Sequence, residues 1–153
     1  MRERSYGWFI KLSLSAVILV AFAIPCAAVE RPFKLHGTTS IIGNPFAPDG
    51  ATMEANGTAT HLGNWTEEGP VFFDGSSGPP FAATAMAHFT AANGDHLDVV
   101  LVGTIDASLV ATATYHIVGG TGRFANASGH GDFSAHPNPD GTLSYTATGT
   151  INY

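Results

Sequence analysis

The sequence has 153 residues, which is enough for one domain and not for two. Its single cysteine, Cys26, excludes a disulfide scaffold and a zinc module built on cysteines. The formal net charge is −6 at pH 7 with histidine neutral, and an acidic surface of this kind repels the phosphates of nucleic acids.

Residues 1–28 have the three parts of a secretory signal peptide. A basic start precedes an uncharged apolar run over 12–24, and Pro25 then leads to small residues that end at Ala28. We expect cleavage after Ala28, a mature domain over 29–153, and a secreted or periplasmic location. An uncleaved membrane anchor is the alternative, but the run is shorter than the roughly 20 residues that a spanning helix needs. A lipid-modified Cys26 is disfavoured by Pro25.

Removal of the signal peptide makes the chain more acidic. Residues 1–28 contain three basic residues and one acid, so 29–153 keep 3 basic and 11 acidic residues and a formal charge of −8. Such a surface also repels anionic lipid head groups. We therefore expect the mature chain to bind no nucleic acid and to make no stable membrane insertion.

The rest of the chain alternates apolar and polar residues between clusters of turn-forming residues, a pattern typical of short antiparallel strands. Eight strands are predicted, near Pro32–Thr39, Ala51–Leu62, Gly63–Phe73, Phe81–Ala91, His96–Ile105, Val110–Val118, Ala127–His136 and Thr142–Tyr153. At Gly63 the alternative is a single bent strand in place of two strands.

The inward positions of these strands mix small with large side chains, as in the interior of a narrow barrel. In the last strand, odd positions such as Leu143 and Ile151 are apolar, and even positions such as Thr146 are polar. The predicted fold is all-β: a single eight-stranded antiparallel up-and-down β-barrel of the calycin type. A β-sandwich is the alternative.

The turn at Asn93-Gly94 tests the register of one hairpin. A two-residue type I′ turn would place Phe89 opposite Asp98, so a residue of the buried face would pair with a residue of the solvent-exposed face. We therefore expect a three-residue loop over Asn93–Asp95, or a bulge beside it.

Three residues are predicted to face the barrel interior and to offer polar groups there. His61 has the same odd parity as Ala55 and Ala59, and its ring could serve as a general acid or base, or be a core histidine bonded to a hydroxyl or carbonyl group. Tyr115 and Tyr145 could offer hydroxyl groups to a ligand or simply pack as aromatic rings.

Four further histidines fall on the outer, polar parity, and two of them precede an aspartate by two residues: His88, His96, His116 and His130, with Asp98 and Asp132. A histidine and an aspartate two residues apart point the same way from a strand and could bind a metal ion. Because no compact ligand spacing accompanies them, we expect no metal site.

The segment from Tyr115 to Phe133, YHIVGGTGRFANASGHGDF, resembles the GGTG-[RK]-F segment of the allene oxide cyclase barrel-like superfamily, which includes the plant dirigent proteins. GTATHLGNWT (Gly57–Thr66), FTAANGD (Phe89–Asp95) and the C-terminal YTATGTINY are similar to exported bacterial members. The resemblance implies an eight-stranded barrel with a central cavity. Plant members steer or cyclise reactive apolar substrates without a cofactor. Only Arg123 matches a basic position of the shared motif, where it would contact a ligand or pin the loop.

The sequence leaves three functions open. The leading interpretation is an exported barrel that binds a small apolar molecule or a partner, with His61, Tyr115, Arg123 and Tyr145 as candidate ligand-binding residues. The second is a cofactor-free cyclase or isomerase of the allene oxide cyclase or dirigent type, and the third a filled, purely structural barrel. No nucleophile elbow, phosphate loop or dinucleotide fingerprint occurs, so no cofactor is expected. A cavity of a few hundred Å³ would favour binding or catalysis.

Overall fold

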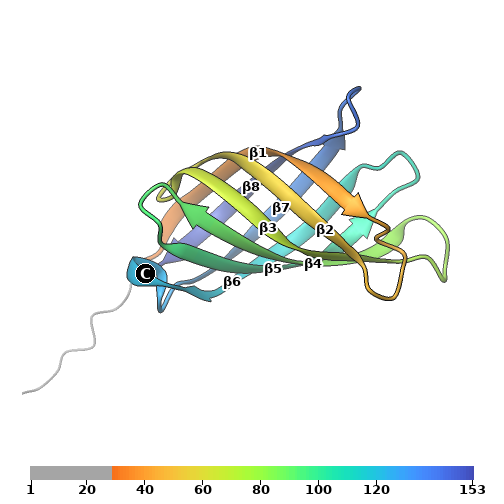
Figure 1. Cartoon of the computed structure of the whole chain (residues 1–153). Helices are drawn as coiled ribbons and strands as arrows, with labels where there is room; N and C mark the ends of the chain where they lie inside the picture. Colours follow the sequence, from red (N-terminus) through yellow and green to blue (C-terminus); the bar gives the residue numbers. More distant parts are fainter. Residues whose placement is uncertain (1–28) are drawn as a thin grey trace, which may run out of the picture.

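A computed structural model describes residues 29–153, so the predicted signal peptide lies outside the described residues. Within them the chain forms eight strands and one short 3-10 helix, drawn in Figure 1. The strands are β1 (Arg31–Gly43), β2 (Ala51–Ala59), β3 (Gly63–Asp74), β4 (Phe81–Ala91), β5 (His96–Ile105), β6 (Ala111–Gly120), β7 (Ser128–Pro137) and β8 (Leu143–Asn152), and the helix η1 (Gly122–Phe124) follows β6.

The sheet closes on itself. Each strand pairs antiparallel with the next one along the chain, and β1 also pairs with β8. The prediction of an all-β, eight-stranded, antiparallel up-and-down barrel is therefore confirmed over the described residues, and the sandwich alternative is wrong. The boundary at Gly63 separates two strands as predicted, because the chain turns there with a φ of +70° at this glycine. The described residues include no helix with the length and apolarity that a bilayer span requires.

Glycines on the inner wall make room for the largest rings, which gives the predicted mixture of small and large residues a physical reason. The Trp65 ring lies against Gly57, where an added Cβ would come within 2.6 Å of a ring carbon. The Tyr115 ring lies in the same way against Gly131, at 2.7 Å. Both aromatic side chains are buried. The two rings can fill a narrow interior only because the facing positions carry no side chain.

The hairpin between β4 and β5 does not have a two-residue turn, and its loop has three residues, as predicted. The predicted bounds of the loop, Asn93–Asp95, are wrong, because the loop is Ala92–Gly94. Phe89 pairs with Leu97, so apolar residues face each other. The backbone N–H of Ala91 donates to the carbonyl oxygen of Asp95 at 2.9 Å, which leaves Asp95 outside the loop. The last residue of a three-residue hairpin loop takes a positive φ, and here Gly94 does so at +86°.

The two ends of the barrel differ. At one end, the terminal end, lie the first residue of β1, the last residue of β8 and η1, whose Phe124 is fully buried. At the other end, the mouth, lie the loops that join β1 to β2, β3 to β4, β5 to β6 and β7 to β8 (Figure 1). Three large apolar side chains are exposed in or beside these loops: Ile42, Phe46 and Leu109.

Candidate functional site in the barrel interior

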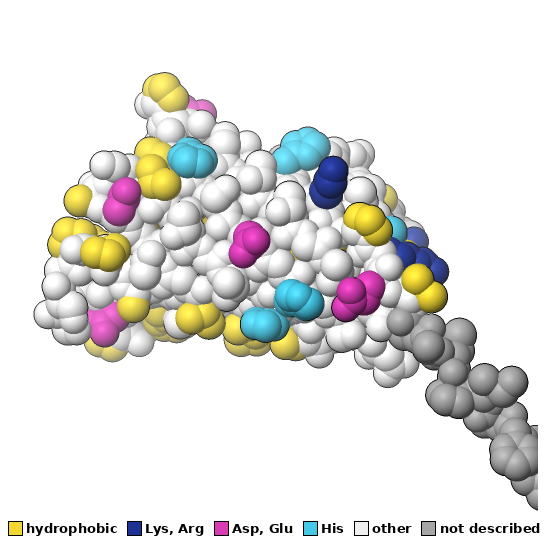
Figure 2. Space-filling model, turned by 180° about the vertical axis from the view of Figure 1, so that it is seen from behind, with side chains coloured by type: hydrophobic (Ala, Val, Ile, Leu, Met, Phe, Trp, Pro, Cys, Tyr) yellow, Lys and Arg dark blue, Asp and Glu magenta, His cyan; other side chains and the backbone are white. Residues whose placement is uncertain are grey.

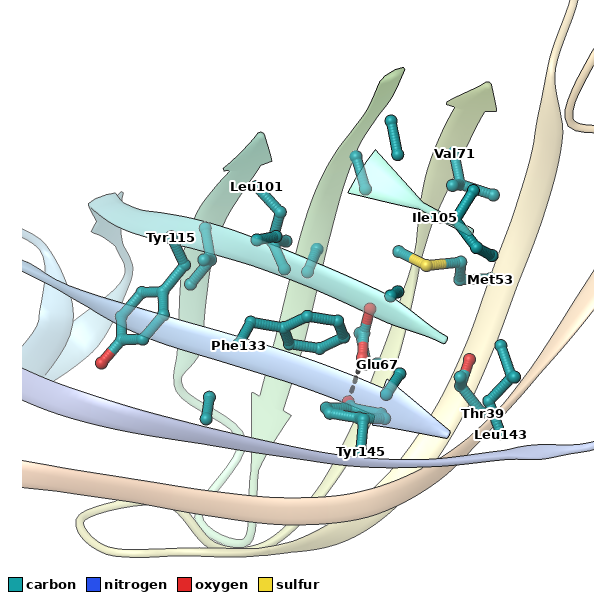
Figure 3. A pocket seen from close by; sticks show the side chains of 18 of the residues that line it. Thr39, Met53, Glu67, Val71, Leu101, Ile105, Tyr115, Phe133, Leu143 and Tyr145 are labelled. Carbon is teal, nitrogen blue, oxygen red and sulfur yellow. Dashed lines mark hydrogen bonds between the residues drawn. The ribbon is translucent and has the colours of Figure 1, made fainter. Parts of the chain in front are cut away.

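A cavity of about 80 Å³ lies inside the barrel (Figure 3) and is lined by side chains from all eight strands. Most of the lining is aliphatic or aromatic, and the aromatic side chains include Phe33, Phe89 and Phe133. The volume is smaller than the few hundred Å³ that a ligand of ordinary size needs. The barrel is therefore largely filled, and the cavity has room for a handful of water molecules or for one slim chain with a similar number of heavy atoms.

The one carboxyl group in this lining belongs to Glu67 of β3, whose side chain is 7% exposed. Glu67 lies on the inner face of β3 with Trp65 and Val71, and it pairs with Ala55 of β2 and Phe89 of β4. Its Oε2 accepts a hydrogen bond from the hydroxyl group of Tyr145 on β8 (Figure 3). Among the described residues, the hydrogen bond from Tyr145 to Oε2 is the only one that this carboxyl group accepts, which leaves Oε1 available.

Burial dominates the acid–base properties of this pair. Loss of water around the carboxylate raises the pKa of Glu67 to about 7, and the hydrogen bond from Tyr145 acts in the opposite direction. Burial and the neighbouring carboxylate raise the pKa of Tyr145 as well. Tyr145 therefore stays protonated and remains a donor, whereas Glu67 takes up and releases a proton near neutral pH.

The raised pKa of Glu67 couples its protonation to folding. The carboxyl group has a pKa of 4.5 in the unfolded chain and about 7 in the folded protein, so between these values the folded state binds more protons. The contribution of this group to the free energy of unfolding is at its maximum below about pH 4.5 and falls as the pH rises to about 7. Over this whole pH range the free energy of unfolding falls by about 3 kcal/mol, since one pKa unit corresponds to about 1.4 kcal/mol.

The two predicted tyrosines both line the cavity, and the prediction that they face inward is confirmed. Only Tyr145 contacts Glu67. The Tyr115 hydroxyl group has no hydrogen-bond partner and points away from Glu67 in Figure 3. Burial and the negative charge of Asp132 raise the pKa of Tyr115 to about 12, so this hydroxyl group is neutral at physiological pH. Tyr115 acts mainly as a packed ring beside Phe33.

The prediction that His61 faces the barrel interior is wrong. Strand β2 ends at Ala59, so the alternation of sides does not continue to His61, which lies in a turn with a φ of +71°. Its Nε2 lies 3.0 Å from the carbonyl oxygen of Pro32, and its Nδ1 lies 3.1 Å from the hydroxyl group of Tyr153. The half-buried ring thus fits the other reading, a histidine bonded to a carbonyl and a hydroxyl group, but at the terminal end.

Arg123 also lies at the terminal end and does not line the cavity. Its Nη2 donates to the backbone oxygen of His61 at 2.5 Å, and its backbone N–H donates to Asp95 at 3.3 Å. The next residue, Phe124, packs edge-on against Tyr153 with ring centroids 5.1 Å apart. The GGTGRF segment therefore closes the terminal end of the barrel with the buried Phe124 ring, and Arg123 adds exposed polar contacts to it.

The outer histidines lie on the barrel wall as their parity predicts. His88 is hydrogen-bonded to Asp98 on the neighbouring strand, with 2.7 Å between Nδ1 and Oδ1, and both side chains are partly exposed. His116 and His130 lie opposite each other on β6 and β7. Within residues 29–153, no three histidine, cysteine, aspartate or glutamate side chains are placed to hold a metal ion.

Glu67 is the functional candidate that the sequence analysis missed. The signal was present: Trp65, Glu67 and Val71 occupy odd positions of one alternating strand, and the same parity places Tyr145 inside. The structure thus brings together one predicted residue, Tyr145, with an unpredicted carboxyl group. Comparisons of the chain with protein-family models, with curated proteins and with solved structures find no match.

Proposed function

We propose that this protein is an exported barrel that binds a small, largely apolar molecule, with a polar group of the ligand placed against Oε1 of Glu67. One observation carries the proposal: an apolar cavity contains a single carboxyl group with one oxygen unused. A carboxyl group buried in an apolar wall costs stability, and an aliphatic residue at the same place would avoid the cost. Groups of this kind with strongly shifted pKa values are concentrated at functional sites.

The mouth supports entry of an apolar ligand. Phe46, in the loop between β1 and β2, is half exposed and packs edge-on against Phe73 and Phe81, with centroids 5.4 and 5.0 Å apart. In Figure 2 hydrophobic side chains gather toward the mouth, whereas lysine and arginine side chains lie toward the terminal end. The cavity lining continues to Ile41, Met53 and Leu143 near the mouth. A slim alkyl chain could therefore extend from Glu67 to the mouth.

Native mass spectrometry of the protein purified from its own host tests this proposal. The expected result is a bound small molecule that is released when the protein unfolds. The variant Ala85→Leu adds three carbon atoms to the cavity wall and should abolish the bound mass, because Ala85 lines the cavity on β4. The matched control is Ala82→Leu, at an exposed position on the outer face of the same strand, which should retain it. An identical bound mass in both variants would contradict binding inside the barrel, and no bound mass in the parent would favour the filled, structural barrel.

A second candidate is a cofactor-free cyclase or isomerase, in keeping with the resemblance to the allene oxide cyclase barrel-like superfamily. The observation that favours it is the Glu67–Tyr145 pair, because a carboxyl group with a pKa of about 7 can act as a general acid or base at neutral pH. The general acid or base would then be Glu67 and not His61, since His61 does not line the cavity. In this case the purified protein would change the mass or the isomer of its ligand, and Glu67→Gln would bind the ligand without changing it.

A further inference from the structure

The barrel cavity is lined by one acidic side chain and by no basic one. The cavity lining includes Glu67, Tyr145 and Tyr115 as its titratable groups, and it includes no lysine, arginine or histidine. The residues opposite Glu67 on the neighbouring strands are Ala55 and Phe89. When Glu67 ionises, the hydrogen bond from Tyr145 therefore stabilises its negative charge, but no cationic side chain of the described residues lines the cavity beside it.

The charges at the mouth have the same sign. Each of the four loops at the mouth contains or begins at an aspartate, and none contains a lysine or arginine: the aspartates are Asp49, Asp74, Asp106 and Asp140. Hydrogen bonds from Ser76 lower the pKa of Asp74, and hydrogen bonds from Thr142 lower the pKa of Asp140, so both are ionised at neutral pH. The three basic residues of the described chain lie elsewhere, on β1 and η1: Arg31, Lys34 and Arg123. An acidic mouth attracts cations and repels anions.

We infer that the ligand of the barrel interior is a slim apolar amine, bound in its protonated form with the ammonium group hydrogen-bonded to Oε1 of Glu67 and the alkyl chain directed to the mouth. This inference rests on the proposed function. The ammonium group would supply the cation that the interior lacks, while the Tyr145 hydroxyl group holds the other carboxylate oxygen. A fatty acid would place two carboxylates together, and an alcohol would leave the charge of Glu67 uncompensated.

The same arrangement makes binding depend on pH. Tyr145 on β8 donates to Glu67, and Tyr115 on β6 stays neutral in the physiological range. The charged groups at the outward positions of β2 to β5 point away from the cavity: Glu54, Glu68 and the His88–Asp98 pair. Glu67 is therefore the group that must lose a proton when the amine binds. Below the pKa of Glu67, affinity should fall by about tenfold for each pH unit.

Isothermal titration calorimetry with three probes of one length tests the inference: n-hexylamine, n-hexanol and hexanoate, each added to the purified exported protein at about pH 8. At this pH an alkylamine is protonated, since primary amines have a pKa of about 10. We expect n-hexylamine to bind about 10- to 100-fold more tightly than n-hexanol, the gain expected for a hydrogen bond between charged groups, and hexanoate to bind most weakly.

Two variants separate the interior carboxyl group from the acidic surface. Glu67→Gln keeps the size of the side chain and an acceptor for Tyr145 but loses the charge, so n-hexylamine should bind no more tightly than n-hexanol. Glu68→Gln removes the adjacent carboxyl group on the outer face of β3 and should leave the preference for the amine unchanged. Urea denaturation at about pH 8 checks that both variants fold.

The outcomes are distinguishable. Equal affinities for n-hexylamine and n-hexanol, or a preference for the amine that survives Glu67→Gln, would overturn the inference while leaving the binding function intact. An equal loss of amine binding in Glu67→Gln and Glu68→Gln would indicate attraction to the acidic surface and would also overturn it. If none of the three probes binds, the proposed function itself fails.

Discussion

Replacement of Tyr145 by alanine should lower the free energy of unfolding by about 3–5 kcal/mol, the usual cost of removing a buried aromatic ring. The Tyr145 side chain is 4% exposed and packs between Trp65 and Phe133, with centroid distances of 5.8 and 5.2 Å. The substitution also removes the hydrogen bond to Glu67. Urea denaturation followed by Trp fluorescence measures the effect, since Trp65 lies against the ring.

The variant Tyr145→Phe distinguishes the contribution of the ring to stability from that of the hydroxyl group. It keeps the packing and leaves Oε2 of Glu67 without its donor, so it should cost about 1–2 kcal/mol, as expected for one buried hydrogen bond. A Tyr145→Ala protein with parent-like stability would mean that the ring does not pack inside the barrel, contrary to the structure.

The second large effect is expected at Phe124, where alanine should also cost about 3–5 kcal/mol. Phe124 is fully buried at the terminal end and contacts Tyr153, so its loss leaves a void where the barrel is closed. Chemical denaturation gives the change in stability. Amide hydrogen exchange should show the greatest loss of protection at the terminal end, near η1 and the last residues of β8.

Arg123→Ala is the matched control in the same segment. The guanidinium group is partly exposed, its ion pair with Asp95 is long, at 3.8 Å, and its hydrogen bond to the backbone oxygen of His61 is exposed to water, so this variant should cost about 1 kcal/mol. If Arg123→Ala destabilised the protein as much as Phe124→Ala, the GGTGRF segment would depend on its polar contacts, and the larger contribution expected from the buried Phe124 ring would be wrong.

The strands could be predicted because a half-buried strand has a strict period of two, and the barrel keeps that period through nearly every strand. The same rule fails at His61, because parity has meaning only while the chain stays extended, and the turn after Ala59 rotates the next side chain out of the pattern. The rule would have placed Glu67 inside with Trp65 and Val71. A glutamate at an inward position of a strand is rare, so the parity of Glu67 alone marks it as a candidate.

The cavity itself could not be predicted from the sequence. Its volume depends on how the rings of Tyr115, Phe133 and Tyr145 pack across the barrel. Alternation identifies which side chains point inward but not how completely they fill the interior. The pairing of Glu67 with Tyr145 is also tertiary, since the two residues lie 78 positions apart in the sequence.

The most direct test of the account is an NMR titration of the Glu67 side-chain carboxyl group, assigned by its absence in Glu67→Gln. A carboxyl group buried in an apolar interior without a cation should titrate with a midpoint of about 7, in agreement with the raised pKa. In Tyr145→Phe, loss of the donor should move the midpoint higher. A midpoint near the ordinary value of 4.5 would show that the carboxylate is hydrated. That result would contradict an apolar binding site built around Glu67.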